Sequence, residues 1–204
     1  VVGNGDWLMA CAASAGPAFE GSGVRCGMRA ARGAIERIRI NPATKQAEVS
    51  IIGGGLARGI CGSGMIDLLA ELWMNGLLDP SGKLNRDKVN GIIRPTEGSS
   101  RVLEYVILPV EKTESGTDIT IDELDIQNLL RTKAAVYSAC AMMLNTVGLD
   151  FDAIAQVYVA GGFGRFLDIE KAILIGMLPD LPREKFTYLG NSALAGAHSM
   201  LVSK

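Results

Sequence analysis

The sequence has few of the features that mark the common catalytic centres. It contains one histidine, His198, in an apolar C-terminal segment, so no Ser/His/Asp triad can be built and a structural or surface role is expected. The phosphate-loop pattern G-x-x-x-x-G-K followed by Ser or Thr is absent, and so is G-x-G-x-x-G. These absences argue against a P-loop NTPase and against a Rossmann dinucleotide site.

Charge and cysteine are also unremarkable. The formal net charge is -2, with 20 Lys and Arg against 22 Asp and Glu, and no basic run favours nucleic acid or an anionic membrane. No signal peptide and no apolar run of about 18 residues is present, so we expect a cytoplasmic protein. The cysteines lack C-x2-C spacing and predict buried free thiols, with a redox or ligand role as the alternative: Cys11, Cys26, Cys61 and Cys140. No metal ligands are assigned within the chain.

Glycine is the residue present in excess. The chain has 25 glycines in 204 residues, against an average of roughly 7%. Many of them lie where a predicted strand gives way to a predicted helix, and the 48% apolar content can form a core. This alternation predicts an α/β protein.

The hydrophobic pattern predicts the elements in order. A hairpin is expected over 1–13, and a strand pair over 33–40 and 47–52. A helix over 63–76 should bury Met65, Leu68, Leu69, Leu72 and Trp73 and leave Asp67 and Glu71 on its surface. Beyond a polar, peripheral excursion at about 77–118, the remaining elements are a long helix within 118–150, a buried strand over 155–160, a helix over 168–179 and a strand–turn–helix over 185–202.

Three glycine turns share one design. SAGPAFEG (14–21), GICGSGMID (59–67) and VAGGFGRF (159–166) each place small residues at or just before a predicted helix start. The first N–H groups of a helix lack partners within it, so such a turn can bind a phosphate. Each turn alone is better explained as a tight connection; three together raise the nucleotide interpretation to an even alternative.

The order of the motifs resembles a known superfamily. A β-meander, a Phe-Glu-Gly turn, a long helix and a strand ending in AGGFG resemble the second lobe of the actin-like ATPase core, the ribonuclease H-like fold of actin, sugar and acetate kinases and heat-shock chaperones. Four segments more specifically resemble the C-terminal ATPase domain of the reductive activators of corrinoid proteins: SAGPAFEGSGVRCGMRAARGAI, GICGSGMID, YVAGGFGRFLDIEKAILIGMLPD and LGNSALAGA. The resemblance implies a mixed β-sheet with flanking helices, spanning 1–204 as one lobe.

The resemblance also implies a function. Such activators couple ATP hydrolysis to the one-electron reduction of a Co(II) corrinoid to Co(I), which methyl transfer requires, and the electron comes from an iron–sulfur cluster. Because the sequence starts at Val1 and lacks cluster cysteines, we expect a piece of a longer chain. That parent chain would supply the cluster, the first lobe and the Mg2+-organising Asp turn. The piece alone would then be inactive. Its partner would be a corrinoid protein or a corrinoid-dependent methyltransferase, with a homodimer as a further option.

The resemblance carries a set of nucleotide-binding residues onto this chain: Ser14, Gly16, Lys133, Gly161, Gly162, Phe163 and Gly164. The paired glycines take the adenosine position, under the ribose and α-phosphate, and Ser14 and Gly16 take the phosphate side. For Lys133 a structural role with a snorkelling stem is the alternative. Glu20 is the candidate catalytic residue, acting on Mg2+-bound water, or else a helix cap. Its neighbour Phe19 is expected in the core.

Further contacts each have an ordinary structural alternative. Ser63 is a helix N-cap or a ligand contact, and Arg165 contacts a phosphate or adenine or is a solvated surface residue. Asn191 and Ser192 close the far side of the cleft or only cap the last helix. Two other functions remain open: a small-molecule kinase of the same superfamily, which would need a catalytic Asp or Glu, and a non-catalytic docking or dimerisation module.

Overall fold

The computed structural model describes residues 1–88, 91–161 and 166–203. Within them the strands form two two-stranded and two three-stranded sheets. The strands are β1 (Val2–Gly3), β2 (Leu8–Met9), β3 (Ala34–Ile40), β4 (Ala47–Ile51), β5 (Gly59–Ile60), β6 (Ile93–Thr96), β7 (Ser99–Leu108), β8 (Ile119–Asp122), β9 (Val157–Ala160) and β10 (Phe186–Gly190). The α-helices are α1 (Gly62–Met74), α2 (Glu123–Thr146), α3 (Ile169–Leu174) and α4 (Ser192–Val202). The short 3-10 helices are η1 (Ala18–Glu20), η2 (Arg86–Lys88), η3 (Val110–Lys112), η4 (Phe151–Ala153) and η6 (Arg183–Lys185).

The first sheet forms where the alternating pattern predicted a strand pair. β3 pairs antiparallel with β4 and, at Ala34 and Ile35 only, parallel with β5. Helix α1 follows β5 directly and packs on β3. Its predicted apolar face is buried except at Trp73, which is 44% exposed because it lies in the last turn, beyond the sheet. Gly76 follows the helix with a positive φ of 65°, a conformation that glycine adopts without strain.

The segment 77–118 contributes to the same core. Strands β6, β7 and β8 form an antiparallel sheet. Ile93 and Tyr105 in this sheet are 1% and 0% exposed and belong to the cluster that also contains the buried residues of α1. The polar composition of the segment reflects its turns, while its strands carry the apolar residues.

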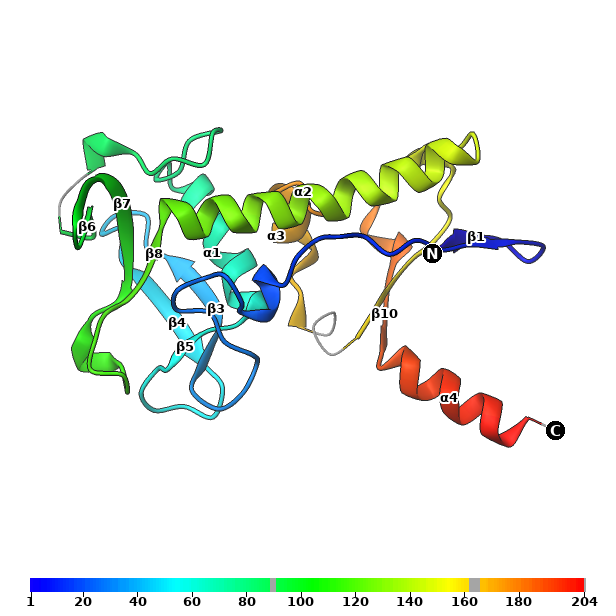
Figure 1. Ribbon diagram of the computed structural model, residues 1–204, viewed down its shortest axis with the longest axis horizontal. Coiled ribbons are helices and arrows are strands. Elements are labelled where there is room, and N and C mark those ends of the chain that lie inside the picture. The colour runs from blue at the N-terminus through cyan, green and yellow to red at the C-terminus, as the bar shows by residue number, and fades with distance from the viewer. Residues whose placement is uncertain (89–90, 162–165, 204) are drawn as a thin grey trace.

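Helix α2 links the two ends of the molecule, running from the β6–β8 sheet to the β1–β2 hairpin and β10 (Figure 1). It begins at a capping box, in which the Asp122 side chain accepts hydrogen bonds from the backbone N–H groups of Leu124 and Asp125 at 2.8 Å each. Gly148, with φ +69°, follows its end as predicted. Leu129 is fully buried, whereas Met142 near the end is 69% exposed.

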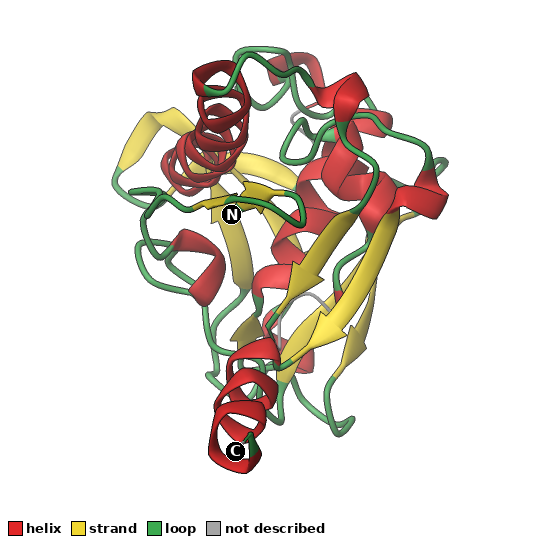
Figure 2. Ribbon diagram, turned by 90° about the vertical axis from the view of Figure 1, so that its right-hand side faces the viewer, coloured by secondary structure: helices red, strands yellow, loops and turns green. Residues whose placement is uncertain are grey.

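The C-terminal part of the chain is much less covered. β9 and β10 are parallel, and Tyr158 in β9 is 62% exposed, although the sequence predicted a buried strand. Only β10 pairs with β9 among the described residues. Helix α4 projects from the end of β10 and buries none of its residues (Figure 2). The predicted burial of β9 would therefore require contacts that the described residues do not supply.

The predictions for the cysteines and for His198 can also be compared with the structure. The cysteines are free, but only Cys61 is buried; Cys26 and Cys140 are half-buried, and Cys11 is exposed because the segment after β2 is uncovered. His198 lies exposed on α4. None of the helices in the described part of the chain combines the length and hydrophobicity that crossing a bilayer requires.

Candidate functional site

The first predicted site segment leads from β2 into η1. Ser14 and Gly16 are exposed, and Gly16 has a φ of +76°. Ala18 and Phe19 in η1 are 4% and 7% exposed, so this small helix is anchored by its apolar side chains, as predicted for Phe19. Glu20 is the last residue of η1 and points to solvent. Pro17 occupies the N-cap and η1 has no side-chain cap, so the structure does not support a capping role for Glu20.

The middle of α2 lies between this segment and the end of α3. A Cβ added to Gly16 would lie 3.9 Å from the Thr132 hydroxyl, and one added to Gly176 would lie 3.2 Å from Lys133 Nζ. Thr132 is buried and Lys133 is half-buried. The fold therefore places the Lys133 ammonium beside the turn that follows α3. It places the neighbouring residue, Thr132, beside the Gly16 turn.

The carboxyl ends of β9 and β10 form the second part of the site. The Gly161 N–H donates a 2.6 Å hydrogen bond to the Gly190 carbonyl. Asn191 follows immediately and caps α4 by accepting from the Leu194 N–H at 3.0 Å, while Ser192 is the first helical residue. The capping alternative for Asn191 is thus confirmed. Parallel strands present a crevice at their carboxyl ends, where helix N-termini favour anions.

At Gly161 the backbone is open to close approach. Its φ is +96°, and an added Cβ would meet no atom within 4 Å. The space and the adjacent N-terminus of α4 fit an anionic group. Gly162, Phe163, Gly164 and Arg165, which the resemblance assigned to the nucleotide, lie outside the described residues.

Ser63 has a different role from both predicted ones. Cys61 is the N-cap of α1, and Ser63 is the second helical residue. Its side chain is buried and its hydroxyl donates to the Glu36 carbonyl at 2.9 Å. The N-cap prediction was wrong because the N-cap lies two residues earlier, at Cys61, and the Ser63 hydroxyl is used inside the fold.

Asp67 and Glu71 are also buried, not on the helix surface as predicted. They are 2% and 6% exposed, and Lys171 Nζ lies 3.4 Å from Asp67 Oδ2 and 3.1 Å from Glu71 Oε1. Burial raises the pKa of the Asp67 carboxyl, against the hydrogen bond from the Ile38 N–H and the charges of Lys171 and Arg37. Sequence reasoning overlooked Lys171, although the polar spacing 63, 67, 71 in an apolar helix was a usable signal.

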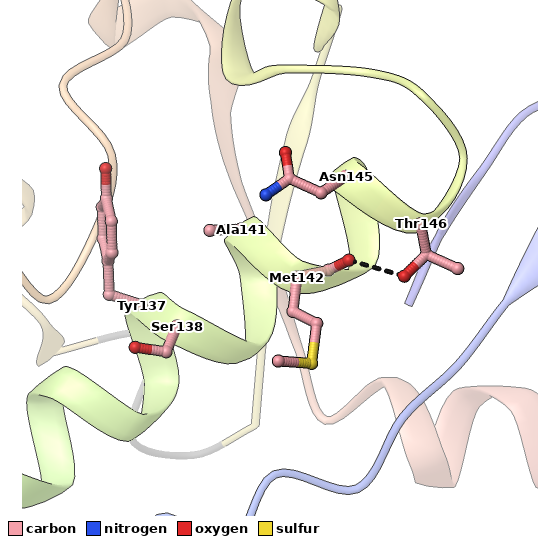
Figure 3. Close-up of a pocket in the computed structure, with 6 residues that line it drawn as sticks. All are labelled: Tyr137, Ser138, Ala141, Met142, Asn145 and Thr146. Carbon is pink, nitrogen blue, oxygen red and sulfur yellow. Dashed lines mark hydrogen bonds between the residues drawn. The ribbon is translucent and has the colours of Figure 1, made fainter.

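A groove lies on the exposed half of α2, and its lining does not include Asp67, Glu71 or Lys171. It has a volume of ≈ 490 Å³ and is lined by Tyr137, Ser138, Ala141, Met142, Asn145 and Thr146 (Figure 3). The Tyr137 ring contacts Phe151, with centroids 5.4 Å apart. None of the predicted site residues that the structure describes lines this groove. No group of three or more potential metal ligands occurs within residues 1–88, 91–161 and 166–203.

Comparison with known proteins gives a consistent result. "Corrinoid activation enzyme RamQ" of Eubacterium limosum is 31% identical over 209 residues, which cover 100% of this chain and 35% of that protein. A Co(II) methylated amine-specific corrinoid protein reductase of Methanosarcina barkeri is 25% identical over 222 residues, covering 98% of this chain and 36% of the relative. The chain therefore spans about a third of the length of these relatives.

A solved structure is similar over almost the whole chain. It is named "Reductive activator for corrinoid, iron-sulfur protein", is 49% identical and superposes with a TM-score of 0.90. The match covers 98% of this chain and 32% of that one. The family model described as the C-terminal domain of RACo, the ASKHA domain, matches residues 1–204. The fold is therefore of the actin-like ASKHA type, and the chain belongs to the family of C-terminal ASKHA domains of RACo.

Proposed function

We propose that this chain is the second, nucleotide-binding lobe of a longer ATP-dependent reductive activator of a corrinoid protein. The observation that carries the proposal is the open Gly161 turn beside the N-terminus of α4, at the carboxyl ends of β9 and β10. The names of the relatives, which refer to corrinoid activation and corrinoid protein reduction, support the choice among ATP-using functions.

The residues divide into two sides of a nucleotide. Gly161 and the N-terminus of α4 would receive the ribose and α-phosphate, because the backbone can approach closely where no side chain intervenes. Ser14 and Gly16 would face the remaining phosphates, and Lys133 would neutralise charge from α2. The exposed Glu20 carboxylate is free to orient a Mg2+-bound water. Bound ATP supplies the free energy of hydrolysis that changes the fit between the two lobes.

The electron does not pass through the residues of this lobe. In the proposed reaction a reduced iron–sulfur cluster in the rest of the parent chain loses one electron, and Co(II) in the corrinoid protein gains it to become Co(I). The lobe would change its affinity for the corrinoid partner with the bound nucleotide. A conformational change can have this effect only if the partner binds the two conformations of the lobe with different free energies.

Several large hydrophobic side chains are exposed on the hairpin, the end of α2, β9 and α4: Leu8, Met142, Tyr158, Leu194, Met200 and Leu201. Exposed hydrophobic side chains that gather into a patch mark interaction surfaces. Since the chain covers about a third of its relatives, we assign these side chains to contact with the remaining part of the parent chain. Slower amide exchange of α4 in the parent than in the 204-residue chain is expected; equal exchange would contradict this.

The kinase alternative needs a catalytic Asp or Glu, and the two acidic residues that follow the second glycine turn do not meet this need. Asp67 and Glu71 are 2% and 6% exposed and both pair with Lys171, so a substrate hydroxyl cannot reach either carboxylate. The docking-module alternative predicts a parent protein that binds no ATP.

The test uses the longer protein, purified without oxygen. Iron analysis and the visible spectrum should reveal a cluster, and titration calorimetry should detect ATP binding. Gly161→Ala should weaken ATP binding, because it strains a positive φ and places a methyl group where the ligand would approach the backbone. Gly98→Ala is the matched control, since Gly98 has φ +83° and equally open surroundings in the β6–β7 turn. An iron-free protein would refute electron transfer, and equal ATP affinity of both variants would refute the nucleotide site.

A further inference from the structure

A polar cavity lies at the end of the β3–β4–β5 sheet where β3 begins and β4 ends. Its volume is ≈ 310 Å³, and the charged residues of its lining are Arg32, Arg58 and Glu114. Leu56 and three glycines complete the lining. We call this cavity the arginine pocket. None of its lining residues belongs to the set assigned to the nucleotide, so it is a separate feature of the lobe.

Backbone hydrogen bonds fix the walls of the arginine pocket. The Gly33 N–H donates to the Ile52 carbonyl at 2.9 Å, and the Arg58 N–H donates to the Gly33 carbonyl at 2.8 Å. The Glu114 N–H donates to the Ala57 carbonyl at 2.8 Å. The three chain segments that line the pocket are therefore held together by the main chain itself.

Two glycines make room for the aliphatic stems of the arginines. A Cβ added to Gly33 would lie 2.6 Å from Arg58 Cδ, and one added to Gly53 would lie 3.0 Å from Arg32 Cγ. Each stem therefore packs directly on backbone. Packing restricts the movement of the stem, so less conformational entropy is lost when the guanidinium group binds a ligand.

The turn between β4 and β5 adds backbone donors. Gly53, Gly54 and Gly55 are consecutive, and their φ angles are +77°, +66° and +83°. Within the described part of the chain, neither the Gly55 N–H nor the Leu56 N–H donates to an acceptor. A Cβ added to Gly54 or Gly55 would meet no atom within 4 Å, so a ligand can approach this backbone closely. Concave turns with free N–H groups are typical of anion sites.

Glu114 balances the positive charge of the pocket only in part. Its Oε2 lies 3.7 Å from Arg58 Nε, which is too long for a hydrogen bond, and the two side chains are 62% and 57% exposed. The lining holds two guanidinium groups and one carboxylate. It therefore carries a net positive charge, which favours an anionic ligand.

We propose that the arginine pocket binds a phosphate group, with Arg32 and Arg58 as charged donors and the N–H groups of Gly55 and Leu56 as neutral donors. Guanidinium groups match phosphate because two parallel N–H groups can donate to two of its oxygens. The volume of ≈ 310 Å³ is that of the smaller sites for organic ligands, about 300–1,000 Å³. The phosphate group can therefore belong to the free ion or to a small organic ester. Glu114 competes with it for Arg58.

Titration calorimetry of the longer parent protein tests the pocket, with inorganic phosphate as the ligand and chloride holding the ionic strength constant. The double variant Arg32→Gln, Arg58→Gln should raise the Kd for phosphate about tenfold or more, since charge-assisted hydrogen bonds are lost. Glu114→Gln should lower the Kd about twofold to fivefold, the range that an exposed ion pair accounts for. A purely structural ion pair would not produce tighter binding on its removal. Glycerol 3-phosphate, titrated in parallel, distinguishes an organic ester from the free ion by its affinity.

Two other arginines provide the matched control. Arg39 and Arg131 are exposed, and neither lines the pocket. The double variant Arg39→Gln, Arg131→Gln removes the same charge and should leave the Kd for phosphate unchanged within about twofold. Equal weakening by both double variants would show that phosphate responds only to net charge, and the pocket would be refuted. Wild-type affinity in the Arg32→Gln, Arg58→Gln variant, or no saturable phosphate binding at all, would also refute it.

The outcomes also separate this pocket from the proposed nucleotide site, on which it does not depend. If Gly161→Ala weakens phosphate binding and the Arg32→Gln, Arg58→Gln variant does not, phosphate occupies the nucleotide site; the pocket is then refuted and the proposed function stands. If the wild type binds phosphate through the arginines but binds no ATP, the pocket stands and the proposed function fails. Amide exchange across 53–58 locates the ligand: slower exchange with phosphate supports the pocket, and an unchanged rate refutes it.

Discussion

Replacing Gly64 with alanine should destabilise the chain although alanine is the better helix former. Gly64 lies in the first turn of α1, where an added Cβ would be 2.5 Å from the Ile35 carbonyl oxygen and 3.0 Å from Ile60 Cγ1. The oxygen belongs to the backbone of β3, so it cannot move aside as a flexible side chain can. Ordinary contact begins at 3.4 Å, so helix and strand must separate by about 0.9 Å.

The cost follows from what that separation disturbs. The Cys61 N–H donates to the same oxygen at 3.1 Å, and Ser63 donates to the next carbonyl at 2.9 Å. Overpacking costs about 1–3 kcal/mol and weakened hydrogen bonds about 1 kcal/mol, against a helix-propensity gain of about 1 kcal/mol. We expect a net loss of about 1–3 kcal/mol in the free energy of unfolding.

Urea denaturation of the 204-residue chain, followed by far-UV circular dichroism, measures this loss. Gly196→Ala is the matched control, because Gly196 is also inside a helix but an added Cβ there meets nothing within 4 Å. The control should gain up to about 1 kcal/mol. An unchanged or higher urea midpoint for Gly64→Ala would show that α1 does not pack on β3 as closely as described.

Further predictions concern the sheet of β6, β7 and β8 and the start of α2. Asp122→Ala removes the capping box and should cost about 1 kcal/mol in urea unfolding, whereas Asp122→Asn should cost much less; equal losses would contradict the cap. Burial raises the pKa of the Glu104 carboxyl, but hydrogen bonds from Arg94 and Arg25 outweigh burial and leave it below its usual value. Its contribution is therefore present above the unfolded-state pKa and is lost as pH falls through the folded-state pKa. Glu104→Gln should make the melting temperature less dependent on pH below about pH 4, and an unchanged slope would refute this. Tyr105→Phe removes the 2.9 Å bond from its hydroxyl to the Lys45 carbonyl and should cost about 1 kcal/mol, measured in the same way.

The local elements were largely predictable because their signals are local. Alternating residues in 33–40 and 47–52 gave the β3–β4 pair, and Gly76 and Gly148 follow α1 and α2 as expected. The glycine turn at Gly161 and the cap at Asn191 also depend on a few neighbouring residues. The family was identified from the order of four short motifs, and the match over residues 1–204 confirms it.

The polar face of α1 shows where such reasoning stops. Helical periodicity indicates that Ser63, Asp67 and Glu71 share one face of α1, but it does not say what that face meets. A polar face normally meets water, so a surface position was predicted. Here it meets the uncovered edge of β3, whose N–H and carbonyl groups need partners as much as the side chains do.

In the region of β9 and α4 the opposite occurs, because apolar side chains are exposed there. The apolar residues of β9 predicted a buried strand, yet Tyr158 is 62% exposed, and Leu194 in the apolar helix α4 is 66% exposed. By itself, then, the sequence determined the elements, their order and the family, because propensity, caps and glycine turns act over a few residues. Only the tertiary structure decided which faces are covered, since burial depends on segments far apart in the chain, as Lys171 and Ile38 are.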